Sequence, residues 1–269
     1  MPSSTMVPAA ALGLSGERTW LLLGELPPAP RLAVVGSRAA SRRLLADVPA
    51  AVAAAGARGH SLVSGGARGV DAAVHRAALA VGVPQLAILP CGPDAVYPPE
   101  HASLFTAIAT APGSGLLFAQ PSGGARSRGM FSSRNALVVA AASALLVVEA
   151  QLRSGSWGTG RQALHKRIPT AAIAASSGCA ALIAAGARAL GTASDVGVWL
   201  DDLAADRPPA PLVWPADLAW LAAALAHAGP HGLGLDDLDD PGTACAALLT
   251  AELEGLIVES PPGRYHARR

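Results

Sequence analysis

The segment LVSGGARGVDAAVH, residues 62–75, predicts a short buried strand, a glycine-rich turn and the start of a helix. Glycines let backbone N–H groups crowd around an anion, and the helix N-terminus behind the turn adds a partial positive charge. The turn also carries Arg68, whose planar guanidinium suits a phosphate. The segment therefore predicts a strand–turn–helix unit with an anion-binding turn.

The same alternation of short apolar runs with helical stretches extends from residue 32 to residue 174. The predicted strands are residues 32–36, 61–65, 85–90, 115–120, 144–150 and 170–174, and the predicted helices are 41–55, 69–81, 99–110, 133–142 and 159–166. Nearly continuous apolar strands separated by helices are typical of a parallel sheet covered on both faces. The sequence thus predicts an α/β fold with ligands bound at the carboxyl ends of the strands.

Composition shifts divide the chain further. Residues 1–30 are turn-rich and predict an N-terminal extension, 31–205 hold the α/β pattern, and 206–215 form a proline-rich linker. Residues 216–269 predict short helices followed by a β-hairpin, which is the layout of a winged helix.

The net charge of +1 hides a strong asymmetry along the chain. Residues 31–188 contain 15 basic and 5 acidic side chains, a net charge of +10, whereas residues 189–269 contain 4 basic and 12 acidic ones, a net charge of −8. This distribution predicts that the basic part binds an anion and that the acidic part has a different partner.

Several classes of protein do not fit the sequence. The longest apolar run, residues 136–148, is shorter than the roughly 20 residues of a membrane-spanning helix, and the N-terminus lacks the pattern of a signal peptide. Three widely separated cysteines without a CxxC pair favour neither a zinc site nor a disulfide framework. We expect a cytoplasmic protein without a metal or cofactor.

Four turns after predicted strands share a small residue beside an arginine or a hydroxyl. In chain order, the first to fourth turns are residues 36–38, 64–69, 131–135 and 154–159. Because these strands end at one sheet edge, we expect the turns to form one phosphate-binding surface. Its predicted members are Gly36, Ser37, Arg38, Ser64, Gly65, Gly66, Arg68, Gly69, Arg134, Asn135, Ser154, Gly155 and Thr159. No GK[ST] or GxGxxG motif is present, so a nucleoside triphosphate or dinucleotide held in the usual way is not expected.

Asp71 and His75 lie one helical turn apart and allow two interpretations. In one, a carboxylate orients a histidine general base. In the other, which we favour, both are structural supports of the turn, and Glu149 similarly binds loop N–H groups. No convincing catalytic set is present, and the histidines show no metal-ligand spacing.

In order and spacing, several motifs resemble the DNA-processing protein A (DprA, or Smf) family. They are VVGSR, SGGARGVDAAVH, CGPDAVYPPEH, FSSRNALV, LLVVEAQLRSGSWGT and SGCAALIAAGA, within about residues 32–190. The resemblance implies a Rossmann-like, doubly wound core followed by a winged-helix domain. It also implies a dimeric protein that binds single-stranded DNA in natural transformation, protects it and delivers it to RecA.

The chain departs from the family pattern at Ala136, where the family usually has a further arginine. Arg126 and Arg128, just upstream, can offset the loss of this arginine. The auxiliary basic residues are Arg126, Arg128, Arg153, Arg161 and Lys166, and the predicted base-stacking residues are Phe131 and Trp157.

Two alternative functions remain. One is a nucleotide-binding or nucleotide-cleaving enzyme or sensor of the related phosphoribohydrolase-like superfamily, and the other is a DNA-reading regulator. Related nucleotide-cleaving phosphoribohydrolases have a glutamate at the position of Gln162, and an amide cannot serve as the acid or base. A DNA-reading regulator needs a basic recognition helix, yet the predicted helix carries Glu252 and Glu254 and no basic residue. We hypothesise instead that the acidic tail, with Asp236, Asp237, Asp239 and Asp240, either screens the basic surface or meets a basic partner.

Overall fold

The computed structural model places two compact units, residues 1–205 and residues 206–269, each of which is described separately. The structure describes residues 2–124, 128–206, 215–228, 232–238, 240, 244, 247–248, 250–252, 256–259 and 264–267. The predicted linker lies mostly outside these residues, as do Arg126 and Asp239.

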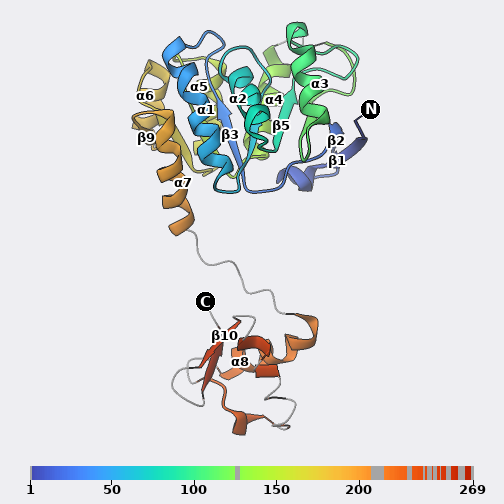
Figure 1. The fold of residues 1–269 in the computed structure, drawn as a ribbon, viewed down its shortest axis with the longest axis vertical. Helices are drawn as coiled ribbons and strands as arrows, with labels where there is room; N and C mark the ends of the chain where they lie inside the picture. Colours follow the sequence, from blue (N-terminus) through green and yellow to red (C-terminus); the bar gives the residue numbers. More distant parts are fainter. Residues whose placement is uncertain are drawn as a thin grey trace. The chain divides into compact units, whose positions relative to one another are not determined.

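The first unit is built on a nine-stranded sheet of order β1-β2-β6-β5-β4-β3-β7-β8-β9 (Figure 1). Its strands are β1 (Ser4–Pro8), β2 (Thr19–Gly24), β3 (Arg31–Val35), β4 (Ser61–Ser64), β5 (Gln85–Leu89), β6 (Gly115–Phe118), β7 (Ala144–Val147), β8 (Thr170–Ile173) and β9 (Arg188–Leu190). Strands β3 to β9 pair in parallel, whereas β1 and β2 add an antiparallel edge. From β3 the chain proceeds outward to β6, then returns to place β7 on the other side of β3. This reversal creates the topological switch point typical of ligand sites in such sheets.

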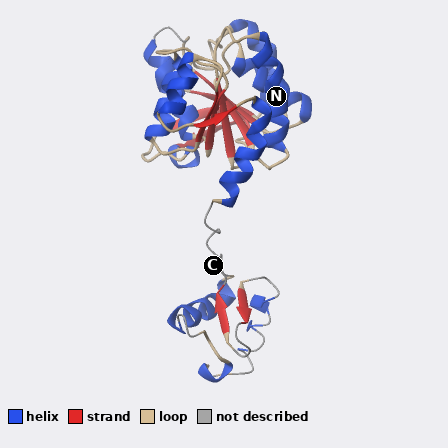
Figure 2. Ribbon diagram, turned by 90° about the vertical axis from the view of Figure 1, so that its left-hand side faces the viewer, coloured by secondary structure: helices blue, strands red, loops and turns tan. Residues whose placement is uncertain are grey.

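Helices cover both faces of the sheet, as the side view shows (Figure 2). One layer contains α1 (Arg42–Gly56), α2 (Val70–Val81), α3 (Ala102–Thr110) and α7 (Val196–Ala205). The other contains α4 (Arg128–Ala140), α5 (Gly155–His165) and α6 (Ser177–Ala184). Short 3-10 helices are η1 (Ala9–Leu12), η2 (Pro99–His101) and η3 (Ala193–Asp195).

The central strands are apolar throughout because both of their faces are covered. In β7, for example, all four residues are buried, with Leu145 facing one helical layer and Leu146 the other. Such continuous apolar runs are expected where helices pack on both sides of a parallel sheet. The predicted α/β fold with a doubly wound, mostly parallel sheet is confirmed.

Two local predictions are wrong. Residues 1–30 are not a separate extension, because β1 pairs with β2 and β2 pairs with β6, and Trp20 and Leu22 are buried in the common core. The helices expected over 133–142 and 159–166 both begin earlier, at Arg128 and at Gly155, and end at Ala140 and His165. The predicted third turn, residues 131–135, therefore lies inside α4, and the predicted fourth turn, residues 154–159, is the N-cap and first turns of α5.

The second unit has a small apolar core of its own, which includes Leu221, Leu225, Leu248 and Ile257. Its described elements are η4 (Ala216–Leu218), α8 (Ala219–Ala228), η6 (Leu235–Asp237), β10 (Ile257–Glu259) and β11 (Tyr265–Ala267). Strands β10 and β11 form an antiparallel pair, so the predicted hairpin strands are confirmed, whereas the winged-helix layout stays a prediction.

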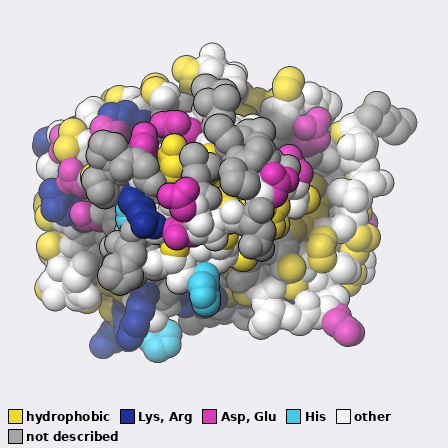
Figure 3. All heavy atoms as spheres, turned by 90° about the horizontal axis from the view of Figure 1, so that it is seen from below, with side chains coloured by type: hydrophobic (Ala, Val, Ile, Leu, Met, Phe, Trp, Pro, Cys, Tyr) yellow, Lys and Arg dark blue, Asp and Glu magenta, His cyan; other side chains and the backbone are white. Residues whose placement is uncertain are grey.

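Acidic side chains are visible on the face shown in Figure 3. In the second unit Asp236, Asp237 and Asp240 are exposed, and Asp237 binds Arg264 at 2.6 Å. One of the predicted acidic groups is thus already paired within the unit. Nowhere in the described residues is a helix both long and apolar enough to cross a lipid bilayer.

Candidate functional site

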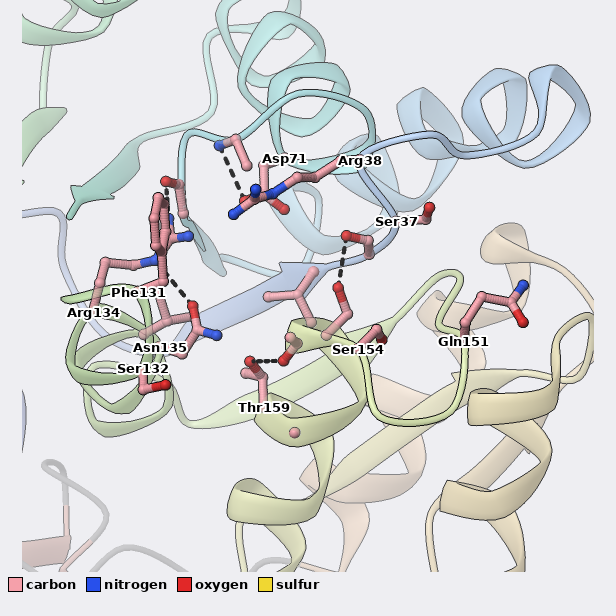
Figure 4. Close-up of a pocket in the computed structure, with 18 of the residues that line it drawn as sticks. Ser37, Arg38, Asp71, Phe131, Ser132, Arg134, Asn135, Gln151, Ser154 and Thr159 are labelled. Atoms are coloured by element: carbon pink, nitrogen blue, oxygen red, sulfur yellow. Dashed lines mark hydrogen bonds between the residues drawn. The ribbon is translucent and has the colours of Figure 1, made fainter. Parts of the chain in front are cut away.

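A cavity of about 950 Å³ lies at the carboxyl ends of the central strands, around the switch point between β3 and β7 (Figure 4). Most of its lining side chains are polar or very small. The lining residues are Val35, Gly36, Ser37, Arg38, Ala39, Gly65, Ala67, Asp71, Phe131, Ser132, Arg134, Asn135, Val138, Gln151, Arg153, Ser154, Gly155, Ser156, Gly158, Thr159 and Gln162. Residues of all four predicted turns therefore meet in one cavity.

The first and fourth turns are joined directly. The Ser156 hydroxyl, in the first turn of α5, donates to the Gly36 carbonyl oxygen at 2.7 Å. Ser154 caps α5 by accepting the Trp157 N–H at 3.2 Å. This cap begins the helix beside the cavity, where its first N–H groups and its dipole favour an anion.

The second turn is held by buried side chains from three different elements. Arg134 of α4 donates to the Gly65 carbonyl oxygen, and His101 of η2 donates from Nδ1 to the Gly66 carbonyl oxygen at 3.1 Å. Asp71 of α2 accepts the Ala67 N–H at 3.2 Å. Three consecutive residues of the turn are thus fixed by an arginine, a histidine and a carboxylate.

Arg134 is only 4% exposed, which makes it unlike a surface phosphate ligand. Besides Gly65, its guanidinium donates to the Ile88 carbonyl oxygen at 3.2 Å and to Asn135 Oδ1 at 3.0 Å. Burial lowers the pKa of Arg134, and the charge of Asp71 opposes this effect. The donors of Arg134 are largely used within the protein, where the side chain supports the second turn; its role as a direct phosphate contact stays a prediction.

Four residues of the second turn that were predicted to bind phosphate do not line the cavity. Ser64 is buried and its hydroxyl donates to the Val34 carbonyl oxygen at 2.7 Å. Gly66 faces Leu89 and Phe105, and Gly69 lies against the backbone of Ser37. Arg68 points away from the cavity to an exposed ion pair with Glu100. Only Gly65 and Ala67 bring this turn to the cavity wall.

Each of the two predicted base-stacking rings is in contact with an arginine side chain. The Arg38 guanidinium lies 4.9 Å from the Phe131 ring centroid, and that of Arg161 lies 4.9 Å from the Trp157 centroid. Such contacts are cation–π interactions. Phe131 and Arg38 line the cavity, whereas Trp157 and Arg161 do not.

Of the remaining predicted residues, some line the cavity and others do not. Arg153 lines the cavity, but Lys166, at the far end of α5, does not. Thr159 is buried and its hydroxyl donates to the Gly155 carbonyl oxygen at 2.9 Å, so this hydroxyl helps to hold the helix. Arg128 begins α4, but its side chain lies outside the described structure.

Asp71 and His75 have separate partners. The Nδ1 of the fully buried His75 donates to Gln85 Oε1 at 2.7 Å, and Gln85 donates back to the His75 carbonyl oxygen at 3.3 Å. Burial, opposed by the Gln85 hydrogen bond, lowers the pKa of His75. Glu149 accepts the Ser41 N–H at 2.9 Å, at the start of α1. These contacts hold backbone and neighbouring side chains and leave no oriented acid–base pair.

The lowered pKa of His75 predicts a loss of stability in mild acid. Below a pH of about 6.5 the unfolded chain protonates this histidine while the folded protein does not. The free energy of unfolding is then expected to fall with decreasing pH by up to about 1.4 kcal/mol per unit until the folded-state pKa is reached, and to show no such contribution above neutrality. Urea unfolding between pH 5 and pH 8 measures this slope.

The control for this experiment is the exposed His165. His165→Gln should keep the acid-dependent slope, whereas His75→Gln should reduce it. An unchanged slope in His75→Gln contradicts the assignment.

Sequence reasoning missed Gln151 in the cavity wall, and it placed Ser132 and Ser156 in the third and fourth turns without counting them among the phosphate-binding residues. Gln151 comes shortly after β7, so its place at a strand's carboxyl end was a usable signal. It also missed His101, whose importance depends on the fold because it reaches the second turn from η2.

Comparisons with known proteins agree with this architecture. Residues 21–200 match the family described as DNA recombination-mediator protein A. A protein of Mycobacterium tuberculosis named as a DNA processing protein, DprA, is 40% identical over 194 residues, covering 67% of this chain and 48% of that protein. The chain thus spans about half the length of this relative.

Two solved structures are similar. The DNA processing protein A of Streptococcus pneumoniae has a TM-score of 0.61 and 27% identity, covering 72% of this chain and 73% of that one. The DNA processing protein A of Helicobacter pylori, whose structure is described for its single-stranded DNA binding mode, has a TM-score of 0.64 and 23% identity. It covers 75% of this chain and 99% of that one, and at this identity it shows the shared fold. With the family match spanning most of the sheet-containing unit, the chain belongs to the DNA recombination-mediator protein A (DprA) family.

Proposed function

We propose that the protein binds single-stranded DNA and that the cavity at the carboxyl ends of the strands holds its backbone. The convergence of four turns on one cavity carries this proposal. Arg38 and Arg153 supply positive charge at its wall, and the α5 N-terminus supplies oriented N–H groups. The single-stranded DNA binding described for the H. pylori relative supports the same ligand.

A nucleotide-cleaving activity is not favoured. Gln162 lines the cavity at the position where the phosphoribohydrolases carry a glutamate, and its amide neither gains nor loses a proton near neutral pH, so it cannot serve as a general acid or base. Asp71 is the one carboxylate among the described lining residues, and its oxygen already accepts the Ala67 N–H. The cavity therefore supports binding better than acid–base chemistry.

The proposal extends to the wider role of the family. In it, the protein acts in the cytoplasm as a homodimer during natural transformation, protects incoming strands and delivers them to RecA. These steps rest on the family resemblance, and the acidic second unit is a candidate for contact with a basic partner.

The cavity arginines give the test of DNA binding. Arg38→Ala and Arg153→Ala should each weaken binding of a labelled 20-nucleotide single strand, because each removes one phosphate contact. Each should also reduce the slope of log K against log salt by about 0.7. Fluorescence anisotropy titrations from about 50 to 300 mM salt measure both effects.

Arg76→Ala is the matched control, since Arg76 is an exposed arginine of α2 outside the cavity wall. It should bind as the wild type does. The proposal fails if the wild type prefers a duplex of the same sequence, or if the double variant Arg38→Ala/Arg153→Ala binds like the wild type.

A further inference from the structure

Two aromatic rings and two arginines form a row that begins at the cavity, which we call the aromatic row: Arg38, Phe131, Tyr97 and Arg68. Arg38 lies over Phe131, with its guanidinium carbon 4.9 Å from the ring centroid. Phe131 meets Tyr97 edge to face, with centroids 5.9 Å apart and planes at 72°. These residues come from four distant segments: the turn after β3, the turn after β4, the segment after β5 and helix α4.

The fourth member of the row is Arg68, in the turn after β4. Its guanidinium binds the Glu100 carboxylate, three residues beyond Tyr97 in the chain. The hydrogen bond and charge of Glu100 raise the pKa of Arg68, and Tyr97 adds a smaller contribution of the same sign. Tyr97 therefore lies within electrostatic reach of Arg68, and both members of the Arg68–Glu100 pair are exposed.

The row continues the cavity. Arg38 and Phe131 are part of the cavity wall, as Figure 4 shows, whereas Tyr97 and Arg68 lie beyond it. Both aromatic rings are half-buried, so each is fixed by the protein and keeps part of its surface accessible. A strand bound in the cavity therefore meets Arg38 and Phe131, the first two members of the row.

The chemistry of the row suits a single strand. Bases of single-stranded nucleic acid stack on aromatic side chains, while arginines bind the phosphates between them. A duplex presents its phosphates but keeps its bases stacked on one another, so the rings add affinity only for a single strand. Two adjacent rings with an arginine at each end thus select for strandedness and not for sequence.

We propose that Tyr97, together with Phe131, forms a base-stacking platform over which the strand leaves the cavity toward Arg68. Glu100 holds Arg68 in the free protein, and a phosphate of the strand displaces it. This inference rests on the proposed single-stranded DNA binding. It assigns a role to Tyr97 and Glu100, which are outside the predicted phosphate-binding set.

The test compares strands of two lengths. Tyr97→Leu keeps an apolar side chain against the core but removes the ring, and Tyr97→Phe keeps the ring as the matched control. Tyr97→Leu should weaken binding of a 20-nucleotide thymidine strand about 5- to 10-fold and leave the affinity for the dinucleotide pTpT unchanged. Tyr97→Phe should bind both like the wild type.

An abasic strand separates stacking from a structural effect. On a 20-unit strand that lacks bases, the wild type and Tyr97→Leu should bind equally, because no base remains to stack. Glu100→Gln should bind the thymidine strand up to about 5-fold more tightly at low salt, since it frees Arg68 from an exposed ion pair.

The outcomes distinguish this inference from the proposed function. If the wild type binds no single strand, the proposed function itself fails. If the wild type binds and Arg38→Ala weakens it, but Tyr97→Leu binds the long strand normally, the aromatic row is overturned. Equal losses of Tyr97→Leu on the long strand, pTpT and the abasic strand also overturn it, because the tyrosine then acts through the fold.

Discussion

Replacement of Arg134 by methionine should lower the free energy of unfolding by about 3 kcal/mol, a large effect for one side chain. The guanidinium is 4% exposed and supplies hydrogen bonds to the Gly65 and Ile88 carbonyl oxygens. Methionine fills a similar volume but leaves both oxygens without their donor and leaves the buried Asp71 without a neighbouring cation. Urea unfolding at pH 7 measures the loss.

A double-mutant cycle with Asp71→Asn isolates the charge interaction. Because Asp71→Asn removes the uncompensated carboxylate, the double variant should lose less stability than the sum of the two single variants. Arg161→Met is the control, since Arg161 is exposed on α5 and its change should alter stability by less than about 0.5 kcal/mol.

Arg134→Met also distinguishes a side chain that supports the second turn from one that contacts DNA directly. If Arg134 supports the second turn, Arg134→Met should weaken single-strand binding while the slope of log K against log salt stays as in the wild type. A direct phosphate contact predicts instead that the slope falls by about 0.7 with little loss of stability. That second result contradicts the role inferred from burial.

The sequence predicts the central strands of the sheet well because the pattern that marks each of them lies within the strand and its adjoining turns. Strands such as β4 (Ser61–Ser64) and β7 (Ala144–Val147) are covered on both faces, so they appear as short apolar runs between glycine turns. The outer strands β1 and β2 are different. Both lie among prolines and glycines, and β1 has only one buried residue. Strand β2 joins the sheet by pairing with the distant β6, and β1 joins it by pairing with β2. Nothing local signals that pairing.

The candidate site shows a similar division. The glycine turns and their shared sheet edge follow from sequence, because parallel strands end on the same side. Arg38 and Arg134 look equivalent in sequence, since each accompanies small or hydroxyl residues in a motif typical of phosphate binding. They differ only because α4 begins at Arg128, which points Arg134 under the second turn toward Asp71. The distinction between a buried support and an exposed ligand is therefore a tertiary property.

A second large effect is expected at Gly69, the residue before α2. Its φ angle is +72°, and a Cβ there would lie 2.2 Å from the Ser37 carbonyl oxygen and 2.8 Å from the Arg38 carbonyl carbon. Both are backbone atoms, so Gly69→Ala must displace the first turn or the second. The variant should weaken binding of a single strand about tenfold, which is equivalent to about 1.4 kcal/mol.

Gly82, at the other end of α2, provides a nearly ideal control. Its φ angle is +69°, but no atom lies within 4 Å of an added Cβ. Gly82→Ala therefore carries only the cost of a left-handed alanine, about 1 kcal/mol, and should bind DNA like the wild type. Gly69→Ala carries a larger backbone cost, because its ψ angle of −125° lies outside the left-handed helical region that Gly82 adopts, and, in addition, about 2 kcal/mol for the steric conflict. Urea unfolding and anisotropy on both variants separate the two contributions. Equal stability and equal affinity in the two variants would show that the close contact between the first and second turns is not needed. The expected difference would show that the shape of the cavity depends on the absence of a Cβ at Gly69.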